Sequence, residues 1–167
     1  MTGIYSHKLE TGEYLPWTEH AQRVSDRALA IVQSKQFEFP NFDRADIIDS
    51  VHLCALFHDF GKGTRYFQIY LKTPPHQNLN QAFQKEGLFP NESFKEHSLL
   101  SGLCAFKIAY DAFSNKPKNV TEQLASAIFL ACVSHHSSLK SQGWVSETLS
   151  EIEDSTIDNL LHMYRAF

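Results

Sequence analysis

Apolar residues recur every three to four positions in five segments of this 167-residue chain, and this helical spacing restricts its fold more than any other feature. The segments cover residues 17–34, 45–59, 93–113, 120–136 and 154–166. No alternating apolar and polar run is long enough to predict a strand. The sequence therefore predicts an all-α helical bundle that forms one domain over residues 1–167. Its apolar last segment, NLLHMYRAF, is compatible with a domain cut from a longer protein.

Capping patterns support two of the helix starts. Ser93 with Glu96, and Asn119 with Glu122, each fit a capping box at the head of an apolar run. Two stretches are expected to be connections, namely the Pro- and Asn-rich residues 73–91 and the shorter residues 114–119.

Composition excludes several classes of protein. No stretch approaches the roughly 20 apolar residues of a membrane span, and the N-terminus lacks a signal pattern, so we expect a cytoplasmic protein without a membrane partner. Cys54, Cys104 and Cys132 lie in apolar helical segments without a C-x-x-C pair, which favours buried, reduced thiols. The net charge is −4 and no basic run is present. Binding of a polyanion must therefore depend on a few local side chains, on bound metal ions or on a partner protein.

The stretch ALFHDFGKG, residues 55–63, places an imidazole and a carboxylate side by side at the end of an apolar helix. A left-handed C-cap at Gly61, with Lys62 near the negative end of the helix dipole, would explain why the helix stops. It would not explain the buried pair of His58 and Asp59, which costs free energy unless a charged or hydrogen-bonding partner satisfies it.

Four predicted helices each carry a histidine on the apolar face: His20, His58, His97 and His135. One histidine on such a face is usually a core residue bonded to a backbone carbonyl. Four of them, together with Asp59 and the adjacent His136, require a common partner that neutralises a carboxylate and accepts imidazole lone pairs, as a metal does. Helix neighbours point about 100° apart, so an adjacent pair addresses two ions more easily than one. The pattern predicts a dinuclear centre bridged by Asp59.

These motifs resemble the HD-domain metal-dependent phosphohydrolases and, within them, the CRISPR-associated HD nucleases of type I systems. The resemblance covers residues 20–136 and is carried by EHAQRV, LFHDFGKGTRYFQ, EHSLLSG and ACVSHH, in that order. It implies an all-α fold, two transition metals, and cleavage of single-stranded DNA exposed when a guide RNA invades a duplex. The implied ligands of one metal are His20, His58 and Asp59, and those of the other are Asp59, His97, His135 and His136.

Two departures from the family pattern are visible. Ser137 replaces the glycine that often follows the His-His pair, a change that a turn tolerates. The family usually supplies one more carboxylate to the first metal from well beyond this pair, and here the candidates are Asp154 and Asp158. If neither serves, that metal position lacks a ligand.

Several other residues have two possible roles. Lys62 would stabilise phosphate charge beside the metals, although a cation after a helix end also has a structural reason to be there. Gln68 would line the site or be a surface amide. His52 would approach the site or be partly exposed. The remaining histidines are not expected to join the constellation: His7, His76 and His162.

The expected chemistry is two-metal activation of water on a phosphodiester. A ligand set rich in imidazole favours Mn, Fe, Co or Ni over Mg. The chain contains no P-loop, so it is not expected to drive unwinding itself. The resemblance implies a helicase, fused or separate, that supplies single-stranded DNA, and a guide-RNA surveillance complex that recruits the nuclease. Two alternatives stay open at this point: an HD phosphohydrolase acting on nucleotides or cyclic nucleotides, and a docking domain with an incomplete site.

Overall fold

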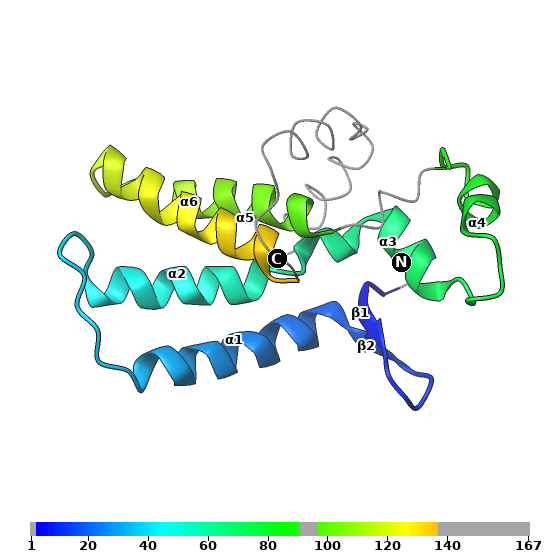
Figure 1. The fold of residues 1–167 in the computed structure, drawn as a ribbon, viewed down its shortest axis with the longest axis horizontal. Helices are drawn as coiled ribbons and strands as arrows, with labels where there is room; N and C mark the ends of the chain where they lie inside the picture. The colour runs from blue at the N-terminus through cyan, green and yellow to red at the C-terminus, as the bar shows by residue number, and fades with distance from the viewer. Residues whose placement is uncertain (1–2, 91–96, 137–167) are drawn as a thin grey trace.

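The structure, a computed structural model, describes residues 3–90 and 97–136 and is mostly helical (Figure 1). This confirms the predicted all-α class. The α-helices are α1 (Trp17–Gln33), α2 (Arg44–Phe57), α3 (Arg65–Lys72), α4 (Leu79–Lys85), α5 (Ser98–Ala112) and α6 (Lys118–Ser134). A 3₁₀ helix, η1 (Phe60–Gly63), joins α2 to α3.

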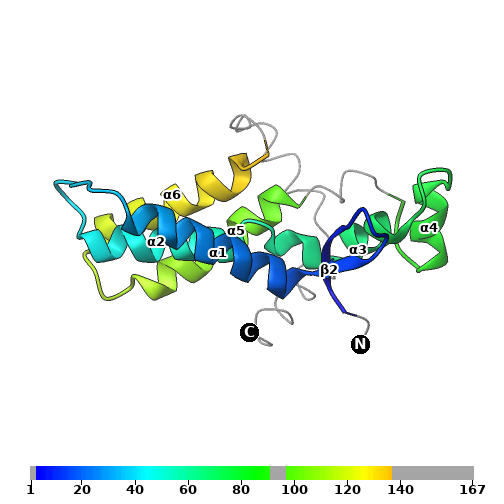
Figure 2. The ribbon, with the colours of Figure 1, turned by 90° about the horizontal axis from the view of Figure 1, so that it is seen from below.

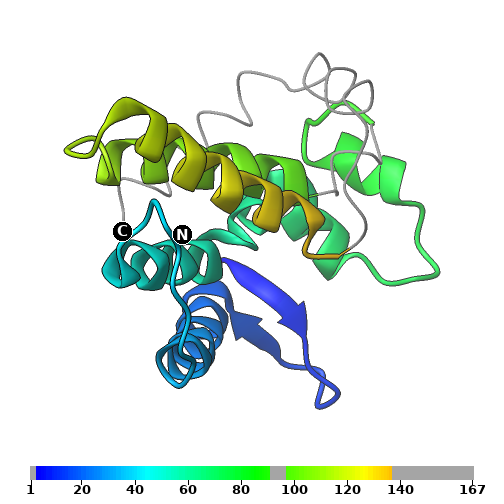
Figure 3. The ribbon, with the colours of Figure 1, turned by 60° about the vertical axis from the view of Figure 1, so that its left-hand side comes forward.

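Helix α2 lies at the centre of the arrangement, between α1 on one side and the α5–α6 pair on the other (Figures 1 and 3). Gly102 lets α5 and α6 approach closely, because a Cβ there would lie 2.5 Å from Val133 Cγ2. Helices α3 and α4 lie at one end of the molecule, and the connection between α1 and α2 lies at the other end (Figure 2). Aromatic rings fill the core where these helices meet, with Trp17 and Phe57 each packed edge-on against Phe60.

A two-stranded antiparallel hairpin precedes α1, and the sequence did not predict it. Its strands are β1 (Tyr5–Lys8) and β2 (Tyr14–Pro16), and Gly12 in the turn has φ of 90°. The hairpin lies beside the first turns of α1 (Figure 3). Strands of this length leave too few alternating positions to stand out in a sequence.

The predicted connection over residues 73–91 is wrong in part, because α4 forms inside it. Asn78 begins this helix, and its side-chain oxygen accepts a hydrogen bond from the Gln81 N–H at 3.1 Å. Helix α3, which was not predicted either, begins in the same way at Thr64, whose hydroxyl accepts from the Phe67 N–H. In both cases one capping side chain starts a short helix that apolar spacing does not reveal.

The helix starts also differ from the predicted ones. The capping box of Asn119 and Glu122 is wrong, because α6 begins at Lys118 and its N-cap is Pro117, which has no capping side chain. Asp43 and Asp46 instead form a reciprocal capping box at the head of α2. The box of Ser93 and Glu96, and the helix expected over residues 154–166, lie outside the described residues.

The three cysteines are free, as predicted, and Cys132 is buried while Cys54 and Cys104 are half-buried. The Cys54 and Cys132 sulfurs lie 3.9 Å apart between α2 and α6. Within residues 3–90 and 97–136, no helix is both long and apolar enough to cross a bilayer.

Candidate metal centre

Asp59 lies at the junction between α2 and η1, and its carboxylate is the centre of a cluster of imidazoles. Helix α2 ends at Phe57, His58 is its C-cap, and Asp59 is the N-cap of η1. The Asp59 backbone carbonyl accepts a hydrogen bond from Trp17 Nε1 at 3.1 Å, which ties this junction to α1. The side chain is turned into the molecule, and the residue is only 2% exposed.

The two carboxylate oxygens of Asp59 face two different sets of side chains. Around Oδ2 lie three nitrogens: His20 Nε2 at 3.0 Å, His58 Nε2 at 3.4 Å and Lys62 Nζ at 2.8 Å. Around Oδ1 lie three others: His97 Nε2 at 2.9 Å, His135 Nε2 at 3.2 Å and His136 Nε2 at 4.0 Å. The structure therefore brings together all six side chains that the sequence singled out as metal ligands.

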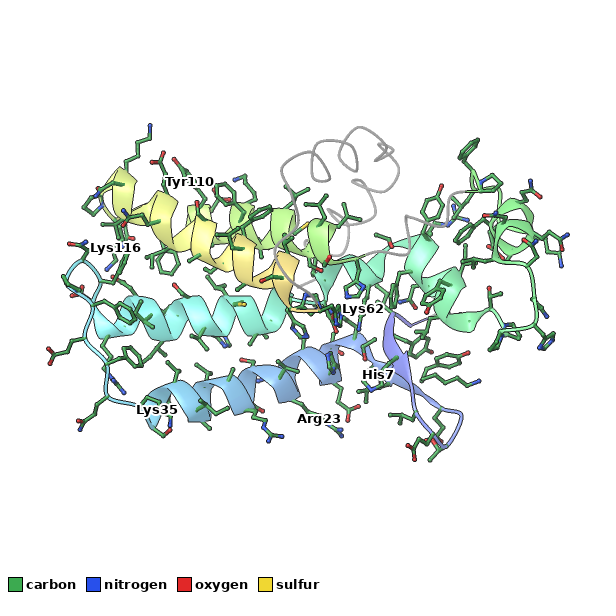
Figure 4. All side chains as sticks on the ribbon, viewed as in Figure 1. His7, Arg23, Lys35, Lys62, Tyr110 and Lys116 are labelled. Carbon is green, nitrogen blue, oxygen red and sulfur yellow. The ribbon has the colours of Figure 1, made fainter. Side chains whose placement is uncertain are left out.

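Each histidine comes from the end of an element, so the cluster forms where several elements converge. His20 is in the first turn of α1, His97 immediately precedes α5, and His135 and His136 immediately follow α6. His97 is the N-cap of α5 and therefore lies at the start of this helix. The sequence predicted it on the apolar face inside a helix over residues 93–113. Figure 4 labels Lys62 at this convergence.

Backbone carbonyls set the orientation of two of the rings. His58 Nδ1 lies 2.7 Å from the Ala55 carbonyl, and His135 Nδ1 lies 2.5 Å from the Cys132 carbonyl. Since a carbonyl only accepts, Nδ1 carries the proton in the neutral ring and Nε2 presents a lone pair to the cluster. This is the arrangement that metal-bound histidines usually have.

Burial and the Asp59 charge oppose each other in setting the pKa values of the cluster. Burial raises the pKa of Asp59, but its interactions with His135, His58 and His97 outweigh burial and hold that pKa well below its usual value. Burial lowers the pKa of His20 and of His97 in spite of the nearby carboxylate. The pKa of His136 is lowered by burial and by its neighbours His135 and His97.

His58 behaves differently from these three imidazoles. Burial lowers its pKa, but the hydrogen bond and charge of Asp59 more than compensate, and the net shift is upward. His20, His97 and His136 thus favour the neutral imidazole that ligates metals, while His58 favours the protonated form.

Gly61 does not form the left-handed C-cap that the sequence predicted. The described glycines with positive φ are Gly12 and Gly87, whereas Gly61 is inside η1. A glycine is needed here for space: a Cβ at this position would lie 2.3 Å from the His97 carbonyl oxygen. The Gly61 N–H also donates to the Ser101 hydroxyl at 2.8 Å, so η1 packs directly against the start of α5.

Gln68 neither lines the cluster nor lies free on the surface, because three hydrogen bonds hold its amide to backbone groups. Its Nε2 donates to the Tyr5 carbonyl at 2.7 Å and to the Lys62 carbonyl at 2.8 Å, and its Oε1 accepts from the Tyr5 N–H at 3.1 Å. Gln68 therefore connects the hairpin to the loop that carries Lys62.

The other histidines also have definite places. His52 is half-buried and does not reach the cluster; its Nδ1 lies 2.7 Å from the Ser25 hydroxyl and links α2 to α1. His76 is exposed in the loop before α4. His7 does not belong to either ligand cluster, as predicted, but its ring packs edge-on against His20 with centroids 5.3 Å apart, a contact that the sequence did not reveal. Asp154, Asp158 and His162 lie outside the described residues.

The donor set fits divalent transition metals. Two clusters of the described residues have ligand atoms within 4.8 Å of one another, His20 with His58 and Asp59, and Asp59 with His97, His135 and His136. His97 Nε2 and His136 Nε2 face each other at 3.1 Å, a contact that one shared cation would satisfy for both lone pairs. Imidazole-rich sets of this kind favour Mn, Fe, Co or Ni, while Mg and Ca prefer oxygen ligands.

Comparison with known families gives one finding. The family model described as "Cas3, HD domain" matches residues 6–165 of this chain. Comparison with curated proteins and with solved structures gave no match.

Proposed function

The chain belongs to the Cas3 HD-domain family, whose members are metal-dependent HD nucleases of type I CRISPR systems, and from this premise we propose that it hydrolyses phosphodiester bonds in single-stranded DNA. The observation that carries the proposal is the division of the Asp59 carboxylate between two sets of imidazoles, His20 and His58 on Oδ2 and three others on Oδ1. One carboxylate with a nitrogen set on each oxygen is the donor arrangement that two cations sharing one bridging ligand require.

We assign His20, His58 and Asp59 to one cation and Asp59, His97, His135 and His136 to the other. When bound, the cations would supply a water of lowered pKa and neutralise charge on the phosphodiester. The protein residues fix the positions of the ligands, since backbone carbonyls orient His58 and His135 and the walls around Asp59 exclude bulk water.

Lys62 is assigned to charge stabilisation beside this centre. Its Nζ lies 2.8 Å from Asp59 Oδ2 and 5.5 Å from the centroid of the Phe67 ring. With the Asp59 carboxylate engaged as a metal ligand, the Lys62 ammonium would be available to a substrate phosphate, where it would stabilise developing negative charge.

The family match supports a proposal for the partners. We propose that a helicase, fused or separate, supplies single-stranded DNA, and that a guide-RNA surveillance complex recruits the nuclease in the cytoplasm. With a net charge of −4, the isolated chain should bind duplex DNA weakly, and tight salt-dependent duplex binding would contradict recruitment by a partner.

The test is a nuclease assay of metal-stripped protein to which each ion is added alone. We expect cleavage of single-stranded DNA with Mn, Fe, Co or Ni and weak cleavage with Mg. Full activity with Mg would contradict the argument from the ligand types. Hydrolysis of mononucleotides or cyclic nucleotides without DNA cleavage would show that the protein is a nucleotide phosphohydrolase and not a nuclease.

Two histidine variants control this assay. His97→Ala removes an imidazole 2.9 Å from Asp59 Oδ1 and should abolish cleavage. His76→Ala removes an exposed imidazole outside the cluster and should cleave at the wild-type rate.

A further inference from the structure

The N-terminal hairpin and the end of α3 form a surface of aromatic and cationic side chains next to the metal centre. We name it the hairpin surface, and it consists of Tyr5, His7, Lys8, Tyr14 and Lys72. The sequence does not reveal it, because β1, β2 and α3 contribute the residues separately. Figure 4 shows His7 at the same end of the bundle as Lys62.

His7 is the inner end of the hairpin surface; it pairs with Leu15 on the face of the hairpin opposite to the Lys8–Tyr14 pair. Its ring meets the His20 ring edge-on, with an interplanar angle of 87°. Ser6 Oγ lies 3.0 Å from His7 Nδ1 and holds the ring in place, and Ser6 itself is 1% exposed. The two clusters of potential ligands do not include His7. A half-buried imidazole that touches a ligand without joining the ligand set is placed to contact what the metals bind, a phosphate group.

The outer part of the hairpin surface is a continuous series of contacts between cations and rings. Lys8 Nζ lies 5.7 Å from the Tyr14 ring centroid, the Tyr14 and Tyr5 centroids are 5.4 Å apart, and Lys72 Nζ lies 5.2 Å from the Tyr5 centroid. Lys8 and Lys72 are exposed, while both tyrosines are half-buried. Each ammonium group therefore lies near a different ring of one tyrosine pair.

This surface is held rigidly against the metal centre. The Gln68 amide bonds both backbone groups of Tyr5, and it lies one helical turn before Lys72 on the same face of α3. The Trp17 N–H donates to the Ile4 carbonyl at 2.9 Å, and the Trp17 indole bonds the Asp59 carbonyl. A ligand on the hairpin surface would consequently have a fixed position relative to Asp59.

We propose that the hairpin surface binds a single-stranded polynucleotide, with His7 contacting a phosphate beside the metals and Lys8 and Lys72 contacting phosphates on either side of a base that packs on the tyrosines. This rests on the proposed nuclease function and extends it to a path for the strand. Single-stranded nucleic acids are bound by such aromatic and cationic surfaces. Two lysines separated by two rings suit a polymer with several phosphates better than a mononucleotide. Glu10 and Glu13 in the turn mark the outer limit of the path, since carboxylates repel phosphate.

The first experiment measures binding of a fluorescent single-stranded oligonucleotide to the metal-stripped full chain at several salt concentrations. Removing two phosphate contacts in Lys8→Ser/Lys72→Ser should reduce the slope of log K against log salt by about 1.4, at about 0.7 for each contact. The control, Lys35→Ser/Lys118→Ser, also removes two positive charges. Lys35 follows the far end of α1 (Figure 4), and Lys118 is 80% exposed at the start of α6. An equal loss of slope in both variants, or no measurable binding by the wild type at low salt, would overturn the proposal.

The second experiment separates the roles of the lysines and of His7. Hydrolysis of bis(p-nitrophenyl) phosphate by the Mn-loaded chain needs one phosphate contact only. The lysine variant should lower kcat/KM for DNA more than for this diester. His7→Ala should lower kcat/KM at least about tenfold for both substrates, with unchanged metal content. His7→Gln, which retains an N–H donor, should recover part of the loss. Full activity of His7→Ala, or loss of metal from it, would contradict a phosphate contact.

Failure of the proposed function would look different from failure of this inference. If the wild type cleaves no DNA, the nuclease function is wrong, and the salt slopes still decide whether the hairpin surface binds a strand. Binding of inorganic phosphate to the Mn-loaded chain, which should weaken about tenfold in His7→Ala, likewise requires no turnover.

Discussion

Asp59 has the contacts that make one residue decisive for both metal positions. Its two oxygens are the only carboxylate oxygens in either candidate cluster of the described residues. Asp59→Ala should therefore remove both ions together and reduce cleavage to background. The helical fold should survive, because the backbone carbonyl of residue 59 would still accept the Trp17 hydrogen bond. Elemental analysis, a nuclease assay and circular dichroism measure the three outcomes.

Two variants make this result specific. Asp111→Ala removes an exposed carboxylate whose partner is Lys107 on the surface of α5, and it should change neither metal content nor cleavage. His135→Ala should affect chiefly the ion on Oδ1. If Asp59→Ala cuts DNA at the wild-type rate, Asp59 does not bridge the metals.

Gly61 is a second residue at which a small change should have a large effect. In Gly61→Ala the new methyl group would collide with the His97 carbonyl, and displacing this carbonyl should cost about 1–3 kcal/mol of unfolding free energy. The same displacement moves His97 away from Asp59, so metal affinity should fall as well. Urea denaturation and metal titration measure the two effects.

Gly12→Ala is the comparison for Gly61→Ala. Gly12 has φ of 90° but no atom within 4 Å of an added Cβ, so its substitution strains the turn and meets no neighbour. It should lower stability modestly and leave metal affinity unchanged. Equal metal affinity in both variants would mean that the contact between η1 and His97 does not position the imidazole.

At the scale of elements, long helices were predictable and short elements were not. Apolar spacing identified α1, α2, α5 and α6 to within a few residues, because each is long enough to show several turns of a buried face. Helices α3 and α4 and the two hairpin strands have 3 to 8 residues each, and local caps and tertiary contacts define them. The predicted C-cap at the end of α2 was wrong for a related reason. Gly61 is required by its close contact with the His97 carbonyl, which is distant in sequence, and not by a local backbone angle.

The attachment of the hairpin to α3 can be tested through Gln68. Gln68→Ala removes three partly buried hydrogen bonds and should lower the free energy of unfolding by about 1–3 kcal/mol. Because Tyr5 loses both backbone partners, proteolysis in the hairpin turn should become faster. DNA cleavage should decrease although the metal ligands are intact.

Gln22→Ala provides the control for Gln68→Ala. The Gln22 amide bonds Asp26 on the exposed surface of α1, and its removal should change neither stability nor proteolysis appreciably. Equal proteolysis of the turn in both variants would show that Gln68 does not hold the hairpin.

At the scale of the whole molecule, metal binding should stabilise the fold, because the candidate ligands come from several elements that bind the ions together only when folded. An ion at about 100 times its dissociation constant adds about 2.7 kcal/mol per site. For a chain of this length each kcal/mol raises Tm by about 2–4 °C. Thermal unfolding should shift upward with Mn or Ni, less with Mg, and return to its starting value with a chelator. A Tm in Asp59→Ala that rises as in the wild type would place the stabilising ions elsewhere.

The candidate site was predictable in its members and not in its surroundings. The order of the histidine motifs identified the candidate ligands, because a metal centre needs imidazole and carboxylate side chains whatever their neighbours are. These ligands are His20, His58, Asp59, His97, His135 and His136. No sequence signal brought His7 to His20, since the contact depends on how Gln68 and Trp17 hold the hairpin. Chemistry can be read from residue types, whereas adjacency depends on the folded chain.

The wide separation of the cluster along the chain has a consequence during protein synthesis. Asp59 and His135 are 76 residues apart, and His97 and His136 are 39 residues apart. A ribosome adding about 5–20 residues each second would release the first histidine several seconds before the last pair. A growing polypeptide would thus hold at most four of the six candidate ligands until α6 has emerged, and the set of imidazoles around Asp59 Oδ1 would be incomplete until then.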